Sequence, residues 1–171
     1  EIKLARTLAE KLEINYGKLT KKNLKKFYLL EHPKIAKSKI TKEEYEMYER
    51  RKLKASDIEK MKIDRVTDKE LEAYNDIDKE ASYIYYLMNN GYSYDEKTIK
   101  EDASDLEYAY VAQNKNKLPG VDISTSWKRV YPYGDVLRQI LGNVSSGEQG
   151  IPEDLKTEYL SKGYSLNDRV G

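Results

Sequence analysis

Helix-start signals recur along the first two-thirds of this chain and constrain its fold more than any other feature. Each signal is a Ser or Thr followed three residues later by Glu, and the four pairs are Thr41 with Glu44, Ser56 with Glu59, Thr67 with Glu70, and Ser104 with Glu107. In such a capping box the hydroxyl accepts from a backbone N–H inside the helix, while the carboxylate accepts from the N–H of the capping residue. Four boxes in one region predict a run of short helices.

Apolar spacing and helix breakers predict further helices. Thr20 can cap a helix that must end by His32, because Pro33 disfavours helical geometry in the residue before it. The clearest helix is expected over residues 76–90, followed by Gly91, which readily adopts the left-handed conformation that closes a helix. A first helix is expected from the apolar stripe of Leu4, Ala5, Leu8, Ala9 and Leu12.

The pattern changes after residues 118–120. Val121, Ile123 and Thr125 alternate with polar residues, as in a strand with one buried face. We expect a strand over about 121–131, a short helix closed by Gly142, and a second short strand around 143–145. Pro152 suits the first position of a last helix, where its missing N–H leaves no hydrogen bond unmade.

These elements predict an α+β fold class. A multi-helix head subdomain, residues 1–117, is expected to pack on a small antiparallel sheet. The sheet belongs to a strand-helix-strand base and linker, residues 118–171.

The charge balance supports a folded domain and limits its partners. The 171 residues include 31 basic and 30 acidic side chains, so the low hydropathy is not joined to the high net charge that disorder requires. A formal net charge of +1 argues against a nucleic-acid partner. One local exception is a lysine cluster, which we interpret as the solvated face of a helix: Lys18, Lys21, Lys22, Lys25 and Lys26.

Catalytic and metal-binding patterns are missing from the sequence. It has no Cys, and its one histidine, His32, lies between Glu31 and Pro33 without a thiol partner. Ser165-Leu166-Asn167 matches the Ser-x-Asn element of serine acyltransferases, but no Ser-x-x-Lys or Lys-Thr-Gly accompanies it. We therefore predict no catalytic, cofactor-binding or metal-binding residue, and no enzymatic activity for this chain.

Several segments from residue 118 onward carry a family likeness. They are Leu118-Pro119-Gly120-Val121, Trp127-Lys128-Arg129-Val130-Tyr131-Pro132-Tyr133-Gly134, Leu141-Gly142, Gly150-Ile151-Pro152-Glu153 and the stretch 159–171. They resemble the N-terminal pedestal (dimerisation or linker) domain of class B penicillin-binding proteins and its join to the transpeptidase domain, in the Gram-positive subgroup. Residues 20–33 are similar to a helix-Pro segment of the same subgroup.

The resemblance implies structural roles for the motif residues rather than catalytic ones. They are Pro119, Gly120, Trp127, Arg129, Tyr131, Pro132, Gly134, Gly142, Asp168, Arg169 and Gly171. The planar guanidinium of Arg129 can hold carboxylate or carbonyl oxygens bidentately. We expect it to clamp the base to the linker, with Asp168 and Arg169 in the same network.

The resemblance also implies a longer parent protein. That parent would be a membrane-anchored serine D,D-transpeptidase that cross-links peptidoglycan, is acylated by β-lactams and lies on the extracytoplasmic face of the bacterial membrane. The present chain opens without an initiator Met, and we expect it to be a non-catalytic piece that touches the membrane only through an anchor helix outside it.

Two partner hypotheses stay open. In the first, the chain carries the transpeptidase domain and docks cell-division or elongation proteins on residues 19–102, with homodimerisation as a further option. In the second, it is a freestanding helical adaptor that binds acidic partners through the lysines of residues 18–26.

Overall fold

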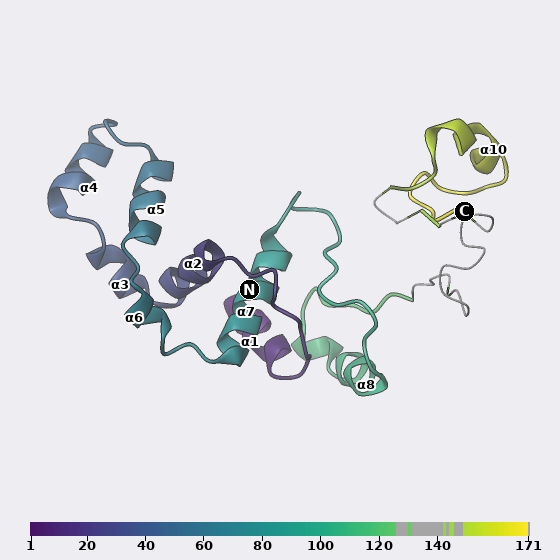
Figure 1. The fold of residues 1–171 in the computed structure, drawn as a ribbon, viewed down its shortest axis with the longest axis horizontal. Helices are drawn as coiled ribbons and strands as arrows, with labels where there is room; N and C mark the ends of the chain where they lie inside the picture. Colours follow the sequence, from purple (N-terminus) through teal and green to yellow (C-terminus); the bar gives the residue numbers. More distant parts are fainter. Residues whose placement is uncertain (126–129, 131–141, 143, 146–148, 171) are drawn as a thin grey trace. The chain divides into compact units, whose positions relative to one another are not determined.

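The computed structural model describes residues 1–125, 130, 142, 144–145 and 149–170. The chain divides into two compact units, Glu1–Ile123 and Ser124–Gly171. Figure 1 shows the helices of the first unit in purple to green and the helical end of the second unit in yellow-green.

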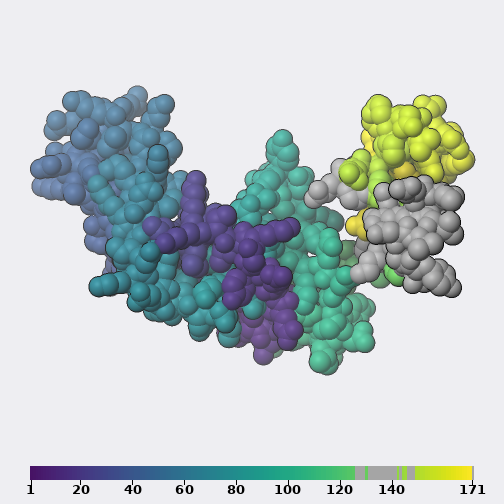
Figure 2. Space-filling view, in the orientation of Figure 1, coloured from purple at the N-terminus to yellow at the C-terminus, as the bar shows by residue number. Residues whose placement is uncertain are grey.

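The first unit is built of short helices. They are α1 (Ile2–Ala9), α2 (Lys21–Glu31), α3 (Pro33–Ser38), α4 (Lys42–Glu49), α5 (Ala55–Asp64), α6 (Asp68–Leu71), α7 (Asp76–Asn89), α8 (Asp105–Gln113) and the 3-10 turn η1 (Lys115–Lys117). Helix α7 packs against α1 and α2, and α2 also contacts α3 and α5. Figure 2 shows the segment of α4 and α5, in blue, as a lobe beside α2.

The predicted caps hold at three of the four boxes. Thr41 and Glu44 form a complete box at α4, and so do Ser104 and Glu107 at α8. At α6 the Thr67 N–H and hydroxyl both donate to Glu70. The prediction for Ser56 is wrong.

Helix α5 begins before Ser56 and uses a different carboxylate. Its capping residue is Lys54, whose N–H donates to Asp57 at 2.9 Å. Glu59, the expected partner of Ser56, pairs instead with Lys26 of α2 at 2.7 Å. The local cap therefore lies two residues earlier than predicted, and Glu59 makes a tertiary ion pair instead.

Two apolar clusters hold the first unit together, and α2 contributes to both. The larger cluster joins the α1 stripe to Phe27 of α2, Ile84 of α7, Val111 of α8 and Leu118. The smaller one contains Tyr28 and Leu29 of α2 with Ile63 and Val66. Because adjacent residues of α2 enter different clusters, this helix is packed on two sides.

The predicted α+β fold with an antiparallel sheet is wrong, because the described residues form helices and no strand. Residues 121–125 are irregular, and the amides that a sheet would use are taken locally. The Val121 N–H donates to the Leu118 carbonyl at 3.1 Å, and the Ile123 N–H donates to its neighbour Asp122 at 2.8 Å.

Packing against helices explains the alternation of apolar and polar residues from Val121 onward. Val121 and Ile123 pack against the larger apolar cluster of the first unit, so their burial needs no partner strand. Val144 and Ser145, in the second expected strand, are also irregular. Val130, within the first expected strand, is likewise irregular and 70% exposed. The other residues of both expected strands, and the helix expected before Gly142, lie outside the described residues.

The second unit contains η2 (Glu153–Leu155) and α10 (Lys156–Ser161). Its buried side chains include Ile151 and Val170. Backbone hydrogen bonds join Ile151 N–H to the Leu166 carbonyl at 2.9 Å and Ser145 N–H to the Val170 carbonyl at 2.8 Å. The last helix was predicted to begin at Pro152, which lies just before η2.

Within the described ranges, none of the helices combines the length and the apolar character needed to cross a bilayer.

Candidate functional site

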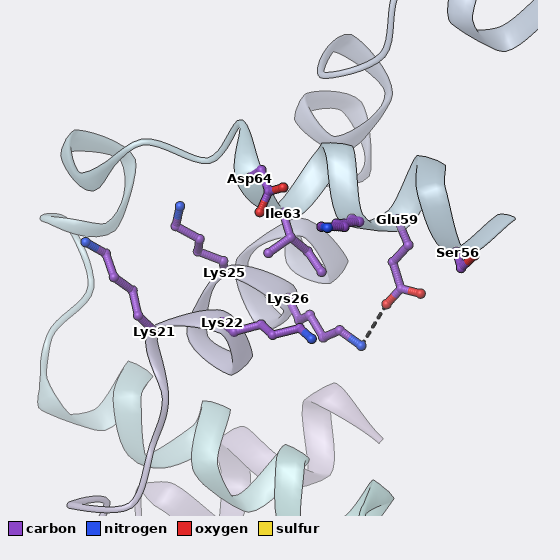
Figure 3. A pocket seen from close by; sticks show the side chains of 9 residues that line it. Lys21, Lys22, Lys25, Lys26, Ser56, Glu59, Ile63 and Asp64 are labelled. Atoms are coloured by element: carbon purple, nitrogen blue, oxygen red, sulfur yellow. Dashed lines mark ion pairs between the residues drawn. The ribbon is translucent and has the colours of Figure 1, made fainter. Parts of the chain in front are cut away.

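A groove of about 580 Å³ runs between α2 and α5 (Figure 3). The two helices contribute lysines, two carboxylates, a serine and one apolar side chain: Lys21, Lys22, Lys25, Lys26, Ser56, Glu59, Lys60, Ile63 and Asp64. Ile63 belongs to the smaller apolar cluster and is 6% exposed. Five ammonium groups against two carboxylates make the groove basic.

Two of these lysines already have partners. Lys26 pairs with Glu59 across the groove at 2.7 Å, as the dashed line in Figure 3 marks. Lys21 pairs with Asp68 at 2.7 Å, and this ammonium lowers the pKa of the Asp68 carboxyl. The other three, Lys22, Lys25 and Lys60, make no ion pair with any residue that the structure describes.

A second charged cluster joins α1, α2 and α7, and its charges are fully paired. Arg6 donates to both oxygens of Glu31, at 2.5 and 2.8 Å, and to Asp78 at 2.7 Å. Tyr74 donates a further hydrogen bond to Glu31. Burial raises the pKa of Glu31, but the hydrogen bonds from Arg6 and Tyr74 outweigh it and leave that pKa below its ordinary value. This Arg6 junction is a structural tie.

Glu107, which the sequence predicted only as the capping partner of Ser104, is also a buried carboxylate. It accepts from Lys100 at 2.6 Å, from the Glu13 N–H at 2.9 Å, and from the N–H and hydroxyl of Ser104. Burial raises its pKa, but these hydrogen bonds outweigh it and lower the pKa to about 2. A carboxylate held this firmly in its charged form is unsuited to donating a proton at neutral pH.

Within the described residues, His, Asp and Glu side chains nowhere gather in the groups of three or more that could hold a metal ion. The groove has more ammonium groups than carboxylates, and such a surplus of positive charge suits binding of an anionic ligand.

Comparison with known proteins identifies the family. The family model for the penicillin-binding protein dimerisation domain matches residues 2–171. The chain belongs to this family. As a member of the dimerisation domain family it is the non-catalytic pedestal region of class B penicillin-binding proteins, which confirms the resemblance seen in the sequence.

Relatives cover nearly all of the chain. Penicillin-binding protein 2A of Bacillus subtilis (strain 168) is 39% identical over 99% of this chain and 24% of the relative. Penicillin-binding protein 2B of Streptococcus pneumoniae (strain D39) is 32% identical over 98% of this chain and 25% of its own length. The chain thus spans about a quarter of the curated relatives that it matches.

A solved structure shares the fold. Penicillin-binding protein 2B from Streptococcus pneumoniae (strain R6) aligns with a TM-score of 0.65 at 30% identity, over 99% of this chain and 26% of the solved one.

Pro119 and Gly120, two of the predicted motif residues, form a turn at the end of η1. The Val121 N–H donates to the Leu118 carbonyl, and Gly120 has φ +80°. Proline at the second position and a left-handed glycine at the third match a type II turn. The turn follows Leu118, which is 1% exposed in the larger apolar cluster.

The C-terminal motif residues are only partly described. Asp168 accepts from the Ser165 N–H at 2.7 Å, and its own N–H donates to the Ser165 carbonyl at 2.9 Å. Arg169 is half-buried, and Gly142 has φ +71°. The motif residues outside the described ranges are Trp127, Arg129, Tyr131, Pro132, Gly134 and Gly171. The network expected of Arg129, Asp168 and Arg169 stays a prediction.

Gly150 is a constrained position that the motif list did not include. Its φ is +59°, and a Cβ built there would lie 2.2 Å from the Leu166 carbonyl oxygen. Both the backbone conformation and the space therefore require glycine. The signal for it in the sequence was the segment Gly150-Ile151-Pro152-Glu153, which we had used only for the family likeness.

Proposed function

We propose that this dimerisation domain holds a membrane-anchored D,D-transpeptidase domain in position for peptidoglycan cross-linking and docks its protein partners. One observation carries the proposal: the family match spans residues 2–171, while the same residues make up about a quarter of the relatives. The chemistry of the parent protein would then reside in the remaining three quarters.

The division of labour within the chain follows from its surfaces. We propose that residues 1–117 form the head, where partners dock within residues 19–102, and that residues 118–171 form the base and the linker toward the transpeptidase domain. The charged helices α2 to α6 support docking on the head, because they present mostly exposed side chains with unbalanced charge at the groove. Cell-division or elongation proteins are the proposed partners.

The proposed location is the extracytoplasmic face of the bacterial membrane, with attachment through an anchor helix of the parent. Protease treatment of intact protoplasts tests it. The full-length protein should be cut within the head while a cytoplasmic marker stays intact, and protection of the head would contradict the proposed location.

Labelling with fluorescent penicillin distinguishes the 171-residue chain from the full-length parent protein. Full-length protein produced from the complete gene should be labelled covalently and lose the label when excess unlabelled penicillin competes. The 171-residue chain should stay unlabelled under the same conditions. Saturable labelling of the 171-residue chain, or no labelling of the full-length protein, would overturn the proposal.

Homodimerisation is proposed for the isolated chain as well. Sedimentation velocity over a range of concentrations should show a monomer–dimer equilibrium. A single monomeric species at every concentration would contradict the proposed homodimerisation.

A further inference from the structure

We propose that the groove between α2 and α5 binds an acidic peptide segment that also carries apolar side chains, supplied by a partner protein. The inference rests on the proposed docking role of the head and names the chemistry of the partner. Its evidence is the combination of three unpaired lysines, a buried apolar residue at the groove and carboxylates that divide the basic surface.

The unpaired charge gives the groove its preference for anions. Lys22, Lys25 and Lys60 line one cavity and make no ion pair within the described residues. Lys22 and Lys60 are exposed, and Lys25 is half-buried. In the Arg6 junction every charged group has an oppositely charged partner, whereas the groove has five ammonium groups and only two carboxylates.

The lysines are also badly placed for the stability of α2. Positive charge at a helix N-terminus opposes the helix dipole, and like charges four residues apart repel each other. Helix α2 nevertheless begins with Lys21 and Lys22 and has no acidic residue in its first turn. Helices α4, α6, α7 and α8 all carry acidic residues there. The Thr20 hydroxyl caps α2 and Asp68 pairs with Lys21, but neither compensates the charges of Lys22 and Lys25, and we take this remaining charge as evidence for an anionic ligand.

The groove distinguishes a peptide from a uniform polyanion. Glu59 and Asp64 line it together with the lysines, so a polymer with charge at every unit would place some of its charges against carboxylates. A peptide can alternate acidic and apolar side chains along its length. Its acidic side chains can meet the unpaired lysines while an apolar side chain packs along the methylene stems of the lysines, beside the largely buried Ile63.

The size of the groove fits this ligand. Its volume of about 580 Å³ lies within the range of pockets that enclose small ligands or a few side chains. We therefore expect a short segment to be recognised rather than a whole folded surface.

Fluorescence anisotropy with a defined probe tests the proposal. The probe is a fluorescein-labelled peptide of repeating Glu-Glu-Leu, titrated with the 171-residue chain at low ionic strength. We expect saturable binding that weakens as salt is added, because partly exposed ion pairs are screened. A peptide of repeating Lys-Lys-Leu should not bind. Absence of saturable binding by the acidic probe would overturn the proposal.

Matched variants locate the site. Lys22→Gln, Lys25→Gln and Lys60→Gln together should weaken binding about tenfold. Lys34→Gln, Lys42→Gln and Lys69→Gln together remove the same charge from exposed positions outside the groove and should leave most of the affinity. Equal losses in the two triple variants would mean a general charge effect and overturn the proposal.

A charge swap guards against variants that fail to fold. Replacing the same three groove lysines by Glu should abolish binding of the acidic probe and create binding of the Lys-Lys-Leu peptide, with an unchanged helical circular dichroism spectrum. A well-folded swap variant that binds neither peptide would contradict the inference.

Two further measurements separate the alternatives. Polyphosphate that displaces the acidic peptide from the groove, and binds more tightly than the peptide, would assign the groove to phosphate polymers and overturn the peptide proposal. Labelling of the full-length protein by fluorescent penicillin is independent of these titrations, so failure of the proposed function and failure of this inference give different results.

Discussion

The two units of this dimerisation domain keep their shape by different means. In the first unit, side chains join helices that are far apart in the sequence: Arg6 of α1 holds Glu31 of α2 and Asp78 of α7. In the second unit, the ties that the structure describes are largely between backbone groups, such as Ile151 N–H to the Leu166 carbonyl. The first unit should therefore be sensitive to loss of charge, and the second to anything that moves the backbone.

Gly150→Ala should have the largest effect and should fall on the second unit. The added Cβ would lie against the Leu166 carbonyl oxygen in a backbone conformation that disfavours alanine. Strain and loss of the adjacent hydrogen bond should destabilise the unit by about 3 kcal/mol. Hydrogen exchange of the Ile151 amide should speed up, while amides of α7 stay protected.

Gly163→Ala is the matched control for that prediction. Gly163 also has a positive φ, of +88°, but a Cβ there meets no atom within 4 Å. This variant should lose only about 1 kcal/mol, the conformational term alone. Equal effects of the two substitutions would show that the close approach to Leu166 does not matter.

Arg6→Leu should be next in size and should fall on the first unit. It leaves Glu31 and Asp78, with side chains 11% and 15% exposed, without their shared cation. Because Arg6 itself is more than a third exposed, we expect a loss of about 2 kcal/mol, between the values for exposed and buried pairs. Urea unfolding followed by circular dichroism measures it.

The control for Arg6 is Lys115→Leu, which removes a pair with Asp122 whose two side chains are mostly exposed. Its unfolding midpoint should barely change. A large change in the unfolding midpoint for Lys115→Leu, or no change for Arg6→Leu, would show that partly buried and exposed ion pairs do not differ in their contribution to stability.

Glu107 gives a pH-dependent test of the first unit. Its folded pKa of about 2 lies below the ordinary value of 4.5. The stabilisation is therefore complete above about pH 4.5 and is lost as the pH falls toward 2, because the unfolded chain then binds the proton first. In that window Glu107 should contribute a slope of up to about 1.4 kcal/mol per pH unit, which Glu107→Gln should remove.

Glu44 and Glu70, whose pKa values are also about 2, should keep part of the slope in that variant. Unfolding by urea at several pH values measures the change. A profile of Glu107→Gln that is parallel to that of the unsubstituted chain would show that the buried carboxylate is not held in its charged form.

The smallest effect on stability is expected from the groove lysines. Lys22→Gln, Lys25→Gln and Lys60→Gln together should shift the free energy of unfolding by no more than about 0.5 kcal/mol, with any change in the stabilising direction because repulsion is relieved. A clear loss of thermal stability would make these lysines part of the scaffold.

Local interactions explain what the sequence predicted well. The caps at Thr20, Thr41 and Ser104 depend on residues three positions apart, so they were visible in the sequence and the structure confirms them. The end of α2 before Pro33 follows from sterics between neighbours. The family could also be predicted, because its motifs are short and continuous.

The wrong predictions concern features that depend on contacts between residues far apart in the sequence. The alternation at residues 121–125 defines which side chains are buried but not what buries them, and here helices of the first unit take the place of a sheet. Glu59 was assigned to Ser56 because Lys26, its partner, lies far away in the sequence. The lysine cluster was visible, but the groove depends on α5 approaching α2, which no local pattern encodes.

The turn at Pro119 and Gly120 has a mechanical consequence. Leu118 is buried in the larger cluster, Val121 and Ile123 pack on its edge, and the chain enters the second unit immediately afterwards. Tension applied from the C-terminal side is therefore delivered to the core of the helical unit through these three side chains, instead of peeling away a surface helix. The helical unit should resist such pulling until that core itself gives way.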